Sequence, residues 1–331
     1  MNIELLVVDA DTGEMYIVIL YTGEMYDVSE IAKEVNWTTQ LEGTAGTLTF
    51  SLTKSALNFP AGSDVIFRIP NKADIFKGKV FTTSFNRDRE LEVTAYDQLR
   101  YLKNNETYIF KNMAAHQIFE KICKDLGLSY EIRARVDHIC VPAIRDNRPL
   151  NEMIQLALDE TYIFEQEYLF VRDDFGKVVL DNINNYQRNY ILDKEVIAED
   201  FSYNRSIDSG TYNQVKLLRL DKNNNVELMY FQEDPATVKK WGPLRLFQKA
   251  DENATSAELK QRAGYLLGVR NSPVEKLSFT CEGKLDLFAG CGLYINLNEI
   301  ITGKTAKYCI ILAAQHTFTN NEHKMTLEVR I

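Results

Sequence analysis

The sequence predicts a mainly β protein of the α+β class, with two antiparallel β-domains and a mixed α/β unit between them. The runs 47–53 and 324–331 alternate apolar and polar residues with a period of two, which is typical of sheets with one buried and one wet face. Helical patterns with start and stop signals occupy the middle of the chain instead. We therefore expect a first β-domain over 1–103, an α/β unit over 104–200 and a second β-domain over 201–331.

Short runs of β-forming residues predict the strands of the first β-domain, at 1–8, 16–20, 47–53, 64–69 and 89–95. In the run 47–53, Leu48, Phe50 and Leu52 share one face. Several strands of this kind within about 100 residues suggest an antiparallel barrel or a sandwich. The pentapeptide TGEMY occurs twice, at Thr12–Tyr16 and Thr22–Tyr26, and we assign it no function.

Two helices and a hairpin are predicted in the α/β unit. Asn112 is expected to cap a helix that runs to Leu126 and stops at Gly127. Pro149 is expected at the first position of the second helix. The hairpin has strands over 168–171 and 177–180, joined by a turn over 173–176.

The second β-domain is expected to contain strands and one helix. The strands are predicted at 214–220, 226–231, 276–281, 293–297, 308–313 and 324–331. Thr255 and Glu258 have the spacing of a capping box, and Gly268 is expected to end the helix that they begin.

Composition and charge exclude several classes of protein. The 331 residues are 45% hydrophobic, 26% charged and 11% aromatic, which excludes a disordered or collagenous chain. The net charge is −9, so sequence-specific nucleic-acid binding is not expected, because gripping phosphate backbones needs a basic surface. Residues 1–110 hold 10 basic and 16 acidic groups, 111–200 hold 11 and 17, and 201–331 hold 17 and 14. This split of −6, −6 and +3 is either ordinary variation or a sign that the portions face different partners.

The five cysteines are widely spaced and include no CxxC pair: Cys123, Cys140, Cys281, Cys291 and Cys309. This pattern predicts reduced thiols in a cytoplasmic or cytoplasm-assembled protein, with Cys281 and Cys309 as small core residues. The first residues lack the basic region of a signal peptide, and no apolar run approaches 18 residues. We therefore expect no membrane association.

Two pairs of residues were weighed as sites of chemistry. His138 and Cys140 would share one face of a strand, but two ligands do not complete a structural zinc site and no HExxH or CxxC pattern accompanies them. Cys291 with His316 would be a nucleophile and its base, but the glycines beside Cys291 favour a turn between strands. Structural roles are the preferred interpretation of all four residues.

The remaining candidates are carboxylate pairs and one aromatic turn. Asp173 with Asp174 and Asp159 with Glu160 are interpreted as solvated charge in a turn and at a helix end. Trp241, followed by Gly242 and Pro243, is interpreted as a packing anchor, with a carbohydrate platform as the alternative. The sequence contains neither GxGxxG nor GxxxxGK[ST]. We predict no catalytic, cofactor-binding or metal-binding residue and no cofactor.

A series of short motifs resembles one known family, the XkdQ/YqbQ proteins of PBSX-like phages, which are related to the late control gene D family of contractile tails. The segment 93–104 ends a strand with the pattern YD-x-L-x-YL, the segment 147–162 resembles the family's Pro-Leu helix, and 168–180 resembles its D-x-x-G hairpin. The segment 316–327 resembles the closing H-x-F…H-x-M-x-L hairpin. The positions that carry the resemblance are Tyr96, Asp97, Leu99, Tyr101, Leu102, Pro149, Leu150, Gly176, Trp241, Gly242, Gly290, His316, Phe318, His323 and Met325.

The resemblance covers most of 45–331 and implies the structural hub of a contractile-tail baseplate, in a phage or a phage-tail-like bacteriocin. It implies two tail-tube-type antiparallel β-barrel domains with the α/β unit between them. Three copies would form a pseudo-sixfold ring that adapts the tail tube protein to the central spike protein, in contact with other baseplate components. His316 and His323 are expected to face each other across strands in a structural role.

Two alternatives remain at this stage. One is the hub portion of a secretion-system spike protein of the valine-glycine-repeat type, which shares the hub barrels. The other is a tail-associated enzyme that degrades the cell wall, which would need a catalytic carboxylate or a zinc cluster.

Overall fold

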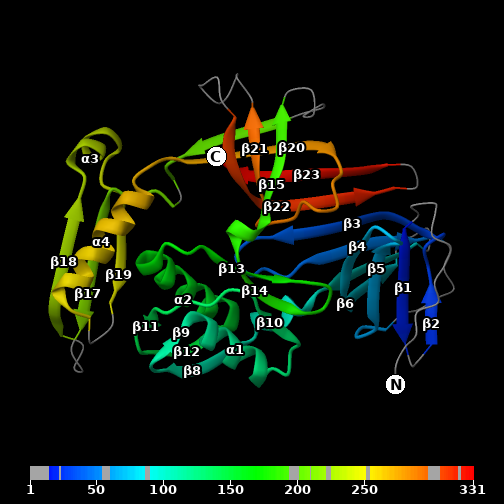
Figure 1. Ribbon diagram of the computed structural model, residues 1–331, viewed down its shortest axis with the longest axis horizontal. Helices are drawn as coiled ribbons and strands as arrows, with labels where there is room; N and C mark the ends of the chain where they lie inside the picture. Colours follow the sequence, from blue (N-terminus) through cyan, green and yellow to red (C-terminus); the bar gives the residue numbers. More distant parts are fainter. Residues whose placement is uncertain are drawn as a thin grey trace.

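The computed structural model describes most of the chain, namely residues 15–21, 24–53, 60–85, 90–193, 201–208, 210–220, 225–250, 254–296, 306–319 and 322–331. These residues form a mainly β structure with a few helices (Figure 1), which confirms the expected class. The predicted strand over 1–8 and most of the first TGEMY copy lie outside the described residues.

The first β region is a curved antiparallel sheet. Its strands are β1 (Tyr16–Tyr21), β2 (Glu24–Asp27), β3 (Ala32–Gln40), β4 (Thr47–Leu52), β5 (Asp64–Ile69), β6 (Ala73–Phe85) and β7 (Leu91–Tyr96). They pair in the order β3-β4-β7-β6-β5-β1-β2. The period-two pattern of β4 is confirmed, because Leu48, Phe50 and Leu52 are all buried.

The second β region is joined to the first through one long strand. Its strands are β15 (Gln187–Asp193), β16 (Phe201–Ser206), β20 (Val274–Glu282), β21 (Gly292–Asn296), β22 (Lys307–Phe318) and β23 (His323–Arg330). On one edge of β22, the first residues pair with β21 and the last six pair with β3. Both regions therefore belong to one thirteen-stranded sheet (Figure 1).

Neither β region forms a closed barrel within the described residues. No strand pairing joins β2 to β3, or β15 to β16, so the sheet ends at β16 and at β2, and β15 ends a branch. The expected barrels are therefore not observed. In the first β region, a closed barrel would need β2 to pair with the outer edge of β3. That edge of β3 is instead paired with the last six residues of β22, which joins the two regions.

The α/β unit follows the first β region directly. Its elements are η1 (Gln98–Lys103), β8 (Asn105–Phe110), β9 (Met113–Ala114), α1 (Ala115–Asp125), β10 (Tyr130–Ile132), β11 (Ile139–Cys140), β12 (Ala143–Pro149), α2 (Leu150–Glu165), β13 (Leu169–Asp173), β14 (Val178–Asn182) and η2 (Ile183–Tyr186). α1 and α2 pack on each other, and β13 and β14 form the predicted hairpin.

The two helix starts differ from the prediction by a few residues. Asn112 has a left-handed backbone (φ 53°) and does not cap α1. Instead the Gln117 side chain accepts a hydrogen bond from the backbone N–H of Ala114, 2.9 Å away, and closes the first turn. Pro149 lies just before α2, in extended conformation, where its fixed φ still suits a helix entrance. Gly127 (φ 65°) follows the last turn of α1, as predicted.

A small subdomain over 214–270 projects from the second β region. It contains β17 (Gln214–Leu220), β18 (Val226–Glu233), α3 (Pro235–Trp241), β19 (Arg245–Lys249) and α4 (Ser256–Arg270). The strands form a separate sheet in the order β18-β17-β19, rather than joining the large sheet as expected. The capping box of Thr255 and Glu258 is confirmed. Gly268, however, lies inside α4, because the helix continues to Arg270.

Each of the four parts has its own buried apolar cluster. The cluster of the second β region also includes Leu41 from the end of β3 and Phe170 and Tyr186 from the α/β unit. These shared residues show that the second β region packs against both the first β region and the α/β unit. None of the helices in the described part of the chain is long and apolar enough to cross a membrane.

Candidate functional site at the junction of the β regions

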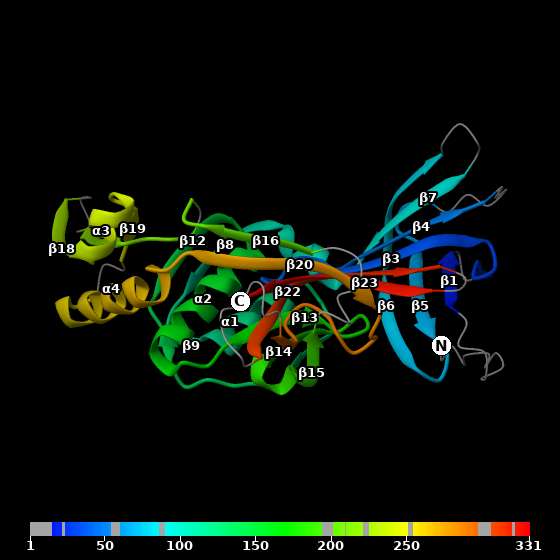
Figure 2. The ribbon, with the colours of Figure 1, turned by 90° about the horizontal axis from the view of Figure 1, so that it is seen from above.

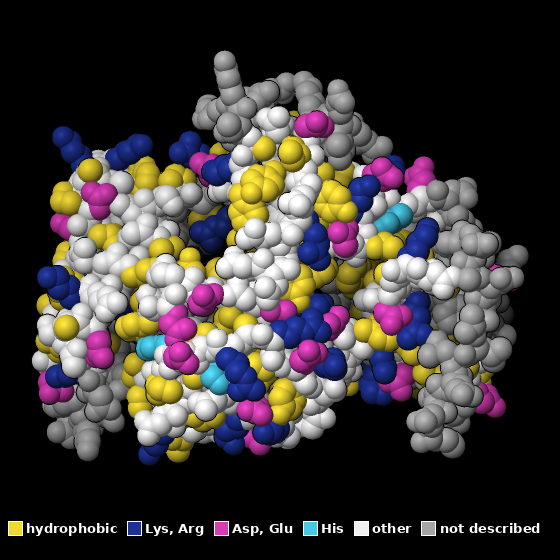
Figure 3. Space-filling model, viewed as in Figure 1, with side chains coloured by type: hydrophobic (Ala, Val, Ile, Leu, Met, Phe, Trp, Pro, Cys, Tyr) yellow, Lys and Arg dark blue, Asp and Glu magenta, His cyan; other side chains and the backbone are white. Residues whose placement is uncertain are grey.

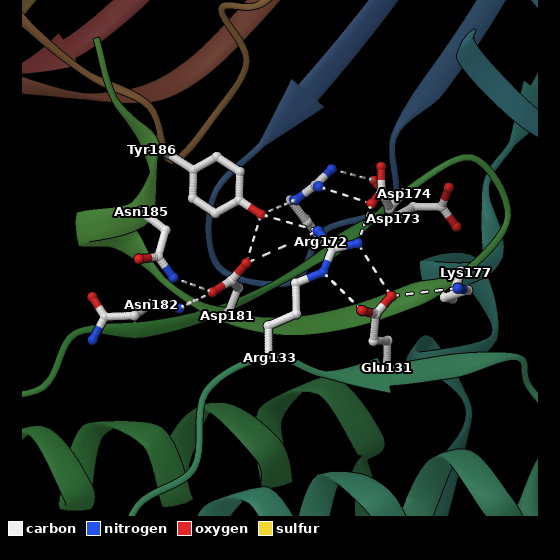
Figure 4. A network of polar contacts seen from close by, with 10 residues as sticks. All are labelled: Glu131, Arg133, Arg172, Asp173, Asp174, Lys177, Asp181, Asn182, Asn185 and Tyr186. Carbon is white, nitrogen blue, oxygen red and sulfur yellow. Dashed lines mark hydrogen bonds and ion pairs between the residues drawn. The ribbon is translucent and has the colours of Figure 1, made fainter.

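The candidate site is the place where the two β regions and the α/β unit meet. The tip of the β13–β14 hairpin reaches this place from the α/β unit (Figures 1 and 4). A cavity of about 230 Å³ lies here, lined by Trp37 and Asp97 of the first region, Arg172 and Phe175 of the hairpin, and Phe288 before β21. Because three parts contribute to its walls, the cavity depends on how these parts are held together.

Asp97 anchors the end of β7 to a neighbouring turn. Its side chain is 5% exposed and accepts hydrogen bonds from the backbone N–H of Leu99 at 2.9 Å and of Gly46 at 2.7 Å. The first bond caps η1. A Cβ at residue 46 would lie 2.5 Å from the Asp97 carboxylate, so this approach requires glycine.

Asp173 connects the hairpin tip to the same turn. One carboxylate oxygen accepts the N–H of Gly176 at 2.7 Å, and the other accepts the N–H of Gln98 at 3.4 Å. Phe175 and Gly176 both have left-handed backbones, with φ of 53° and 83°, so the tip is a tight turn. The D-x-x-G turn of the hairpin thus contacts the segment that follows Asp97.

The charge of Asp173 acts on the neighbouring carboxyl group of Asp97. Burial raises the pKa of Asp173 to about 6. Burial, and next the charge of Asp173, raise the pKa of Asp97 well above its usual value, although its two backbone donors oppose the shift. Two carboxylates in one partly dry site resist simultaneous ionisation.

Two arginines hold the hairpin in place (Figure 4). Arg133 contacts Glu131 through two nitrogens, at 3.1 and 3.2 Å, and contacts Asp174 at 2.6 Å. Arg172 contacts Asp174 at 3.1 Å. Lys177 adds a longer contact to Glu131, at 3.3 Å.

Tyr186 links these arginines to the second β region. Its hydroxyl donates to Asp181 at 2.7 Å and accepts from Arg172 at 3.1 Å (Figure 4). The Arg172 guanidinium also lies 5.1 Å from the Tyr186 ring centre and 5.0 Å from that of Phe288. Asp181 is buried, and it accepts further bonds from Asn182 and Asn185, as a buried carboxylate requires.

A pair of histidines supports the seam between β22 and β3. His316 is fully buried, and its Nε2 donates to the Leu287 carbonyl at 2.8 Å. Its Nδ1 lies 2.9 Å from His323 Nε2, and in the neutral ring this atom accepts the His323 proton. Burial lowers the pKa of both histidines to about 4. His316 pairs with Trp37 of β3, at 4.9 Å between ring centres.

The positions that carry the family resemblance fall into several clusters. Asp97 and Gly176 belong to the junction, and His316, Phe318 and His323 stack together at the seam. Gly290 (φ 101°) packs on Phe170, where an added Cβ would lie 2.5 Å from the ring. The remaining buried positions contribute to the apolar clusters, namely Leu99, Leu102, Leu150 and Met325. Tyr96, Tyr101 and Pro149 are half-buried.

Trp241 and Gly242 lie apart from this junction, at the end of α3. Gly242 has φ 80° and ends the helix, as an aromatic-glycine turn would. Trp241 is half-buried and belongs to none of the four apolar clusters, and α3 buries no residue. The interpretation of Trp241 as a packing anchor therefore stays a prediction.

The residues weighed for chemistry are engaged in other contacts. His138 donates from Nε2 to Glu160 at 3.0 Å, while Cys140 faces the Ala157 carbonyl. Cys291 faces the Asp286 carbonyl, and burial raises the pKa of its thiol to about 11, which disfavours the nucleophilic thiolate. No group of three or more metal-ligating side chains occurs within the described ranges.

Of the four carboxylates that were interpreted as solvated charge, Asp159 is exposed, and the other three make structural contacts. Asp173 and Asp174 have the turn position predicted but bind backbone amides and arginines. Glu160 is buried within α2 and accepts the backbone N–H of Val141 at 2.8 Å.

Sequence patterns did not identify the residues that complete the junction, which are Arg133, Arg172, Asp181, Tyr186 and Phe288. Their contacts join distant segments: Arg133 and Tyr186 are 53 residues apart, and Arg172 and Phe288 are further apart still. The available signal was the Asp-Asp pair in a hairpin turn, since adjacent carboxylates at a tight tip attract arginines.

Comparison with known proteins assigns the chain to a family. The family model described as YqbQ-like matches residues 35–330. The chain belongs to the YqbQ-like family. Two relatives come from Bacillus subtilis (strain 168) and are each 27% identical to this chain: the uncharacterized protein YqbQ and the phage-like element PBSX protein XkdQ. The first match covers 86% of each chain and the second 81% of each. This confirms the resemblance recognised in the sequence.

Solved structures show the same fold in tail proteins. A tail protein from Neisseria meningitidis MC58 has a TM-score of 0.71 at 12% identity, over 96% of this chain and 97% of that one. The 43 kDa tail protein of prophage MuSo2 from Shewanella oneidensis has a TM-score of 0.68 at 15% identity, over 95% and 98%. The E. coli c3393 protein, described as a type VI secretion component similar to the phage T4 tail proteins gp27 and gp5, has a TM-score of 0.53 at 12% identity, over 90% and 73%.

Proposed function

We propose that this YqbQ-like protein is the structural hub of the baseplate in a contractile phage tail or a phage-tail-like bacteriocin. Three copies form a pseudo-sixfold ring that adapts the tail tube to the central spike. The two β regions supply one tube-type domain each, and the α/β unit lies between them. The ring assembles in the bacterial cytoplasm and contacts further baseplate components.

The observation that carries this proposal is the likeness of the fold to tail proteins over nearly the full length of both chains. Membership in the family that includes the PBSX protein XkdQ supports it. Two β regions in series also suit a ring in which three chains must match a sixfold tube, because each chain then offers two similar units.

In this function the junction acts as a rigid joint. A ring of three chains closes only if the two β regions of each chain keep a fixed relative orientation. The contacts of Asp97, Asp173 and Arg172 hold the α/β unit between the regions. The pairing of β22 with β3 holds the regions to each other directly.

The sheet edges supply surfaces for ring closure. β2 and β16 end the order of paired strands within the described residues. An unpaired edge readily pairs with another chain. On β16, Phe201 is 41% exposed and Tyr203 is 36% exposed, which supports burial of this edge in an assembly.

The role proposed is mechanical rather than enzymatic. The thiols and the candidate ligands are buried or bound in structural contacts, which supports a connector over a cell-wall hydrolase. Hydrolysis of peptidoglycan by the purified chain would contradict this part of the proposal.

Mass measurement of the native protein tests the ring. The protein is measured alone and with the tail tube and spike proteins encoded beside it. We expect a complex that contains three copies, formed either alone or only on the spike, since strand edges often need a template. A chain that stays monomeric in every mixture would contradict the hub.

A second function is favoured by the likeness to the c3393 protein, namely the hub portion of a secretion-system spike. The same three-copy ring is expected there. The two functions differ in the partner, because a secretion hub would co-assemble with a secretion tube rather than with a phage tail tube.

A further inference from the structure

The small subdomain over 214–270 presents one covered and one uncovered sheet face. α4 packs on the first face through Val215, Leu217, Leu259 and Ala263. Figure 2 shows α4 on one side of strands β17–β19 and no described helix or strand on the other. We call this uncovered side the open face.

Strand register determines which side chains share the open face. Phe231 of β18, Lys216 of β17 and Phe247 of β19 are direct neighbours across the three strands. Met229, Leu218 and Lys249 form the next row. Glu233, Gln214 and Arg245 form the row on the other side.

The outer strands of the open face, β18 and β19, carry three exposed apolar side chains. Met229 is 54% exposed, Phe231 42% and Phe247 51%. Three large side chains gathered on one small sheet exceed the scattered apolar residues that an ordinary surface carries. A sheet with one face uncovered normally gains stability by burying that face on another layer.

The open face also carries positive charge. Lys216 lies on the central strand, between Phe231 and Phe247, and Arg245 and Lys249 lie on β19, while the same three rows contain the carboxylate of Glu233. That carboxylate already accepts a bond from the Gln214 amide at 2.6 Å. The Arg245 guanidinium lies 5.4 Å from the Phe231 ring centre. Figure 3 shows further Lys and Arg side chains at the α3 end of the subdomain, where Lys239 and Lys240 lie.

The dimensions of the open face fit one helix. Strands of five to eight residues extend roughly 17–26 Å. Their three-strand width is about that of a helix, roughly 10 Å. The same sheet already holds the fifteen-residue α4 on its covered face, so a second helix would complete a three-layer sandwich.

We propose that the open face docks an amphipathic helix from another protein of the particle, with acidic side chains flanking its apolar stripe. The apolar stripe covers Met229, Phe231 and Phe247, one acidic side chain at its edge pairs with Lys216 between the two rings, and the other acidic side chains face Lys249. The positive charge excludes a second open face as the occupant, because like charges would meet. The proposal goes beyond the hub function, since it assigns a binding partner to a part of the chain that the ring does not use.

Site-directed photo-crosslinking in assembled particles tests this docking. The photoreactive residue p-benzoyl-L-phenylalanine replaces Met229 on the open face or, as a control, Val269, which is 40% exposed on α4. We expect position 229 to link to one other tail protein, within a segment of helical periodicity and acidic flanks, and position 269 not to do so. Particles that form without a link at 229, or that link 229 only to this same chain, would overturn the proposal.

Charge reversal tests the electrostatic part. Lys216→Glu with Lys249→Glu is expected to lower the yield of the 229 link about tenfold or more, because acidic flanks would then meet like charge. Lys216→Arg with Lys249→Arg keeps the charge and should retain the link, as should Lys260→Glu on α4. An unchanged yield in the reversed variant would contradict an acidic partner. Failure to form particles in the parent protein would instead count against the hub function.

Discussion

At the scale of single residues, the junction depends on polar groups that are buried with their partners. His316 and His323 share one hydrogen bond at the seam. Both rings are neutral near pH 7, because burial lowers their pKa to about 4. The unfolded histidines have a pKa near 6.5. Unfolding therefore takes up protons between about pH 4 and 6.5, and acid favours the unfolded chain.

We predict that the free energy of unfolding falls as the pH is lowered from about 6.5 toward 4. Each histidine contributes up to about 1.4 kcal/mol per pH unit in that range. His316→Gln combined with His323→Gln removes both titrations, so its stability should fall less steeply over the same range. Urea unfolding at several pH values measures both slopes. Parallel curves for the two proteins would show that the histidines do not titrate on unfolding.

Asp173 has the opposite linkage. Because its pKa is raised to about 6, the folded protein keeps a proton that the unfolded chain loses above about pH 4. The stability that the folded protein gains from this bound proton is fully present below about pH 4 and is lost as the pH rises through 6. We predict that the wild type loses about 1–3 kcal/mol relative to Asp173→Asn between pH 4 and 7. Urea unfolding of both proteins measures this difference, and a gap that stays constant with pH would contradict it.

Two glycines test whether backbone geometry or helix propensity decides a glycine's role. Gly290→Ala should destabilise the protein by about 1–3 kcal/mol, because it combines φ 101° with a clash on Phe170. Gly268→Ala is the matched control, since it lies inside α4 with open space around it. It should stabilise by about 0.5–1 kcal/mol. Thermal unfolding measures both changes, and equal effects of the two variants would contradict the assignment.

At the scale of elements, the β13–β14 hairpin connects the α/β unit to both β regions. Its tip binds the η1 segment through Asp173, and its Arg172 contacts Tyr186 and Phe288. The hairpin is therefore both a strand pair of the α/β unit and the contact between that unit and the sheet.

We predict that Arg172→Ala destabilises the protein by about 2–4 kcal/mol, because it removes a charged hydrogen bond and two ring contacts. The α/β unit should then unfold separately from the β regions, giving two transitions in calorimetry. Lys177→Ala, on the same hairpin, removes only an exposed ion pair with Glu131 and should change stability by less than about 1 kcal/mol. A single unshifted transition for Arg172→Ala would contradict the role of the hairpin.

Local patterns predicted the elements better than their assembly. Alternation predicted β4 and β23, and the capping box predicted the start of α4, because both signals lie within a few neighbouring residues. The facing of His316 and His323 was predictable too, because a hairpin brings residues seven apart together. The contact of Asp97 with Gly46 spans 51 residues, so no local pattern carries it.

The same reasoning explains two errors in the predicted domains. β17 and β18 had the pattern of strands, but a strand pattern does not say which sheet it joins, so the separate subdomain was missed. The expected barrels followed from the family resemblance. In the structure, β21 and β3 both pair with β22, and no local sequence pattern shows which distant strands will pair.

At the scale of the whole molecule, the structure is two sheet regions fixed to each other by a shared strand and a wedged α/β unit. Such a connector suits the ring that we propose between tube and spike, because a closed ring needs the two β regions of each chain in a fixed relative orientation. The subdomain over 214–270 is separate from this frame and is free to bind a further partner through its open face.

Cryo-electron microscopy of the assembled particle tests the hub function most directly. The account predicts three copies of this chain in one ring, at the boundary between the tail tube and the central spike, with the β22–β3 seam intact in each copy. Absence of the chain from that boundary, or a copy number that is not three, would contradict it.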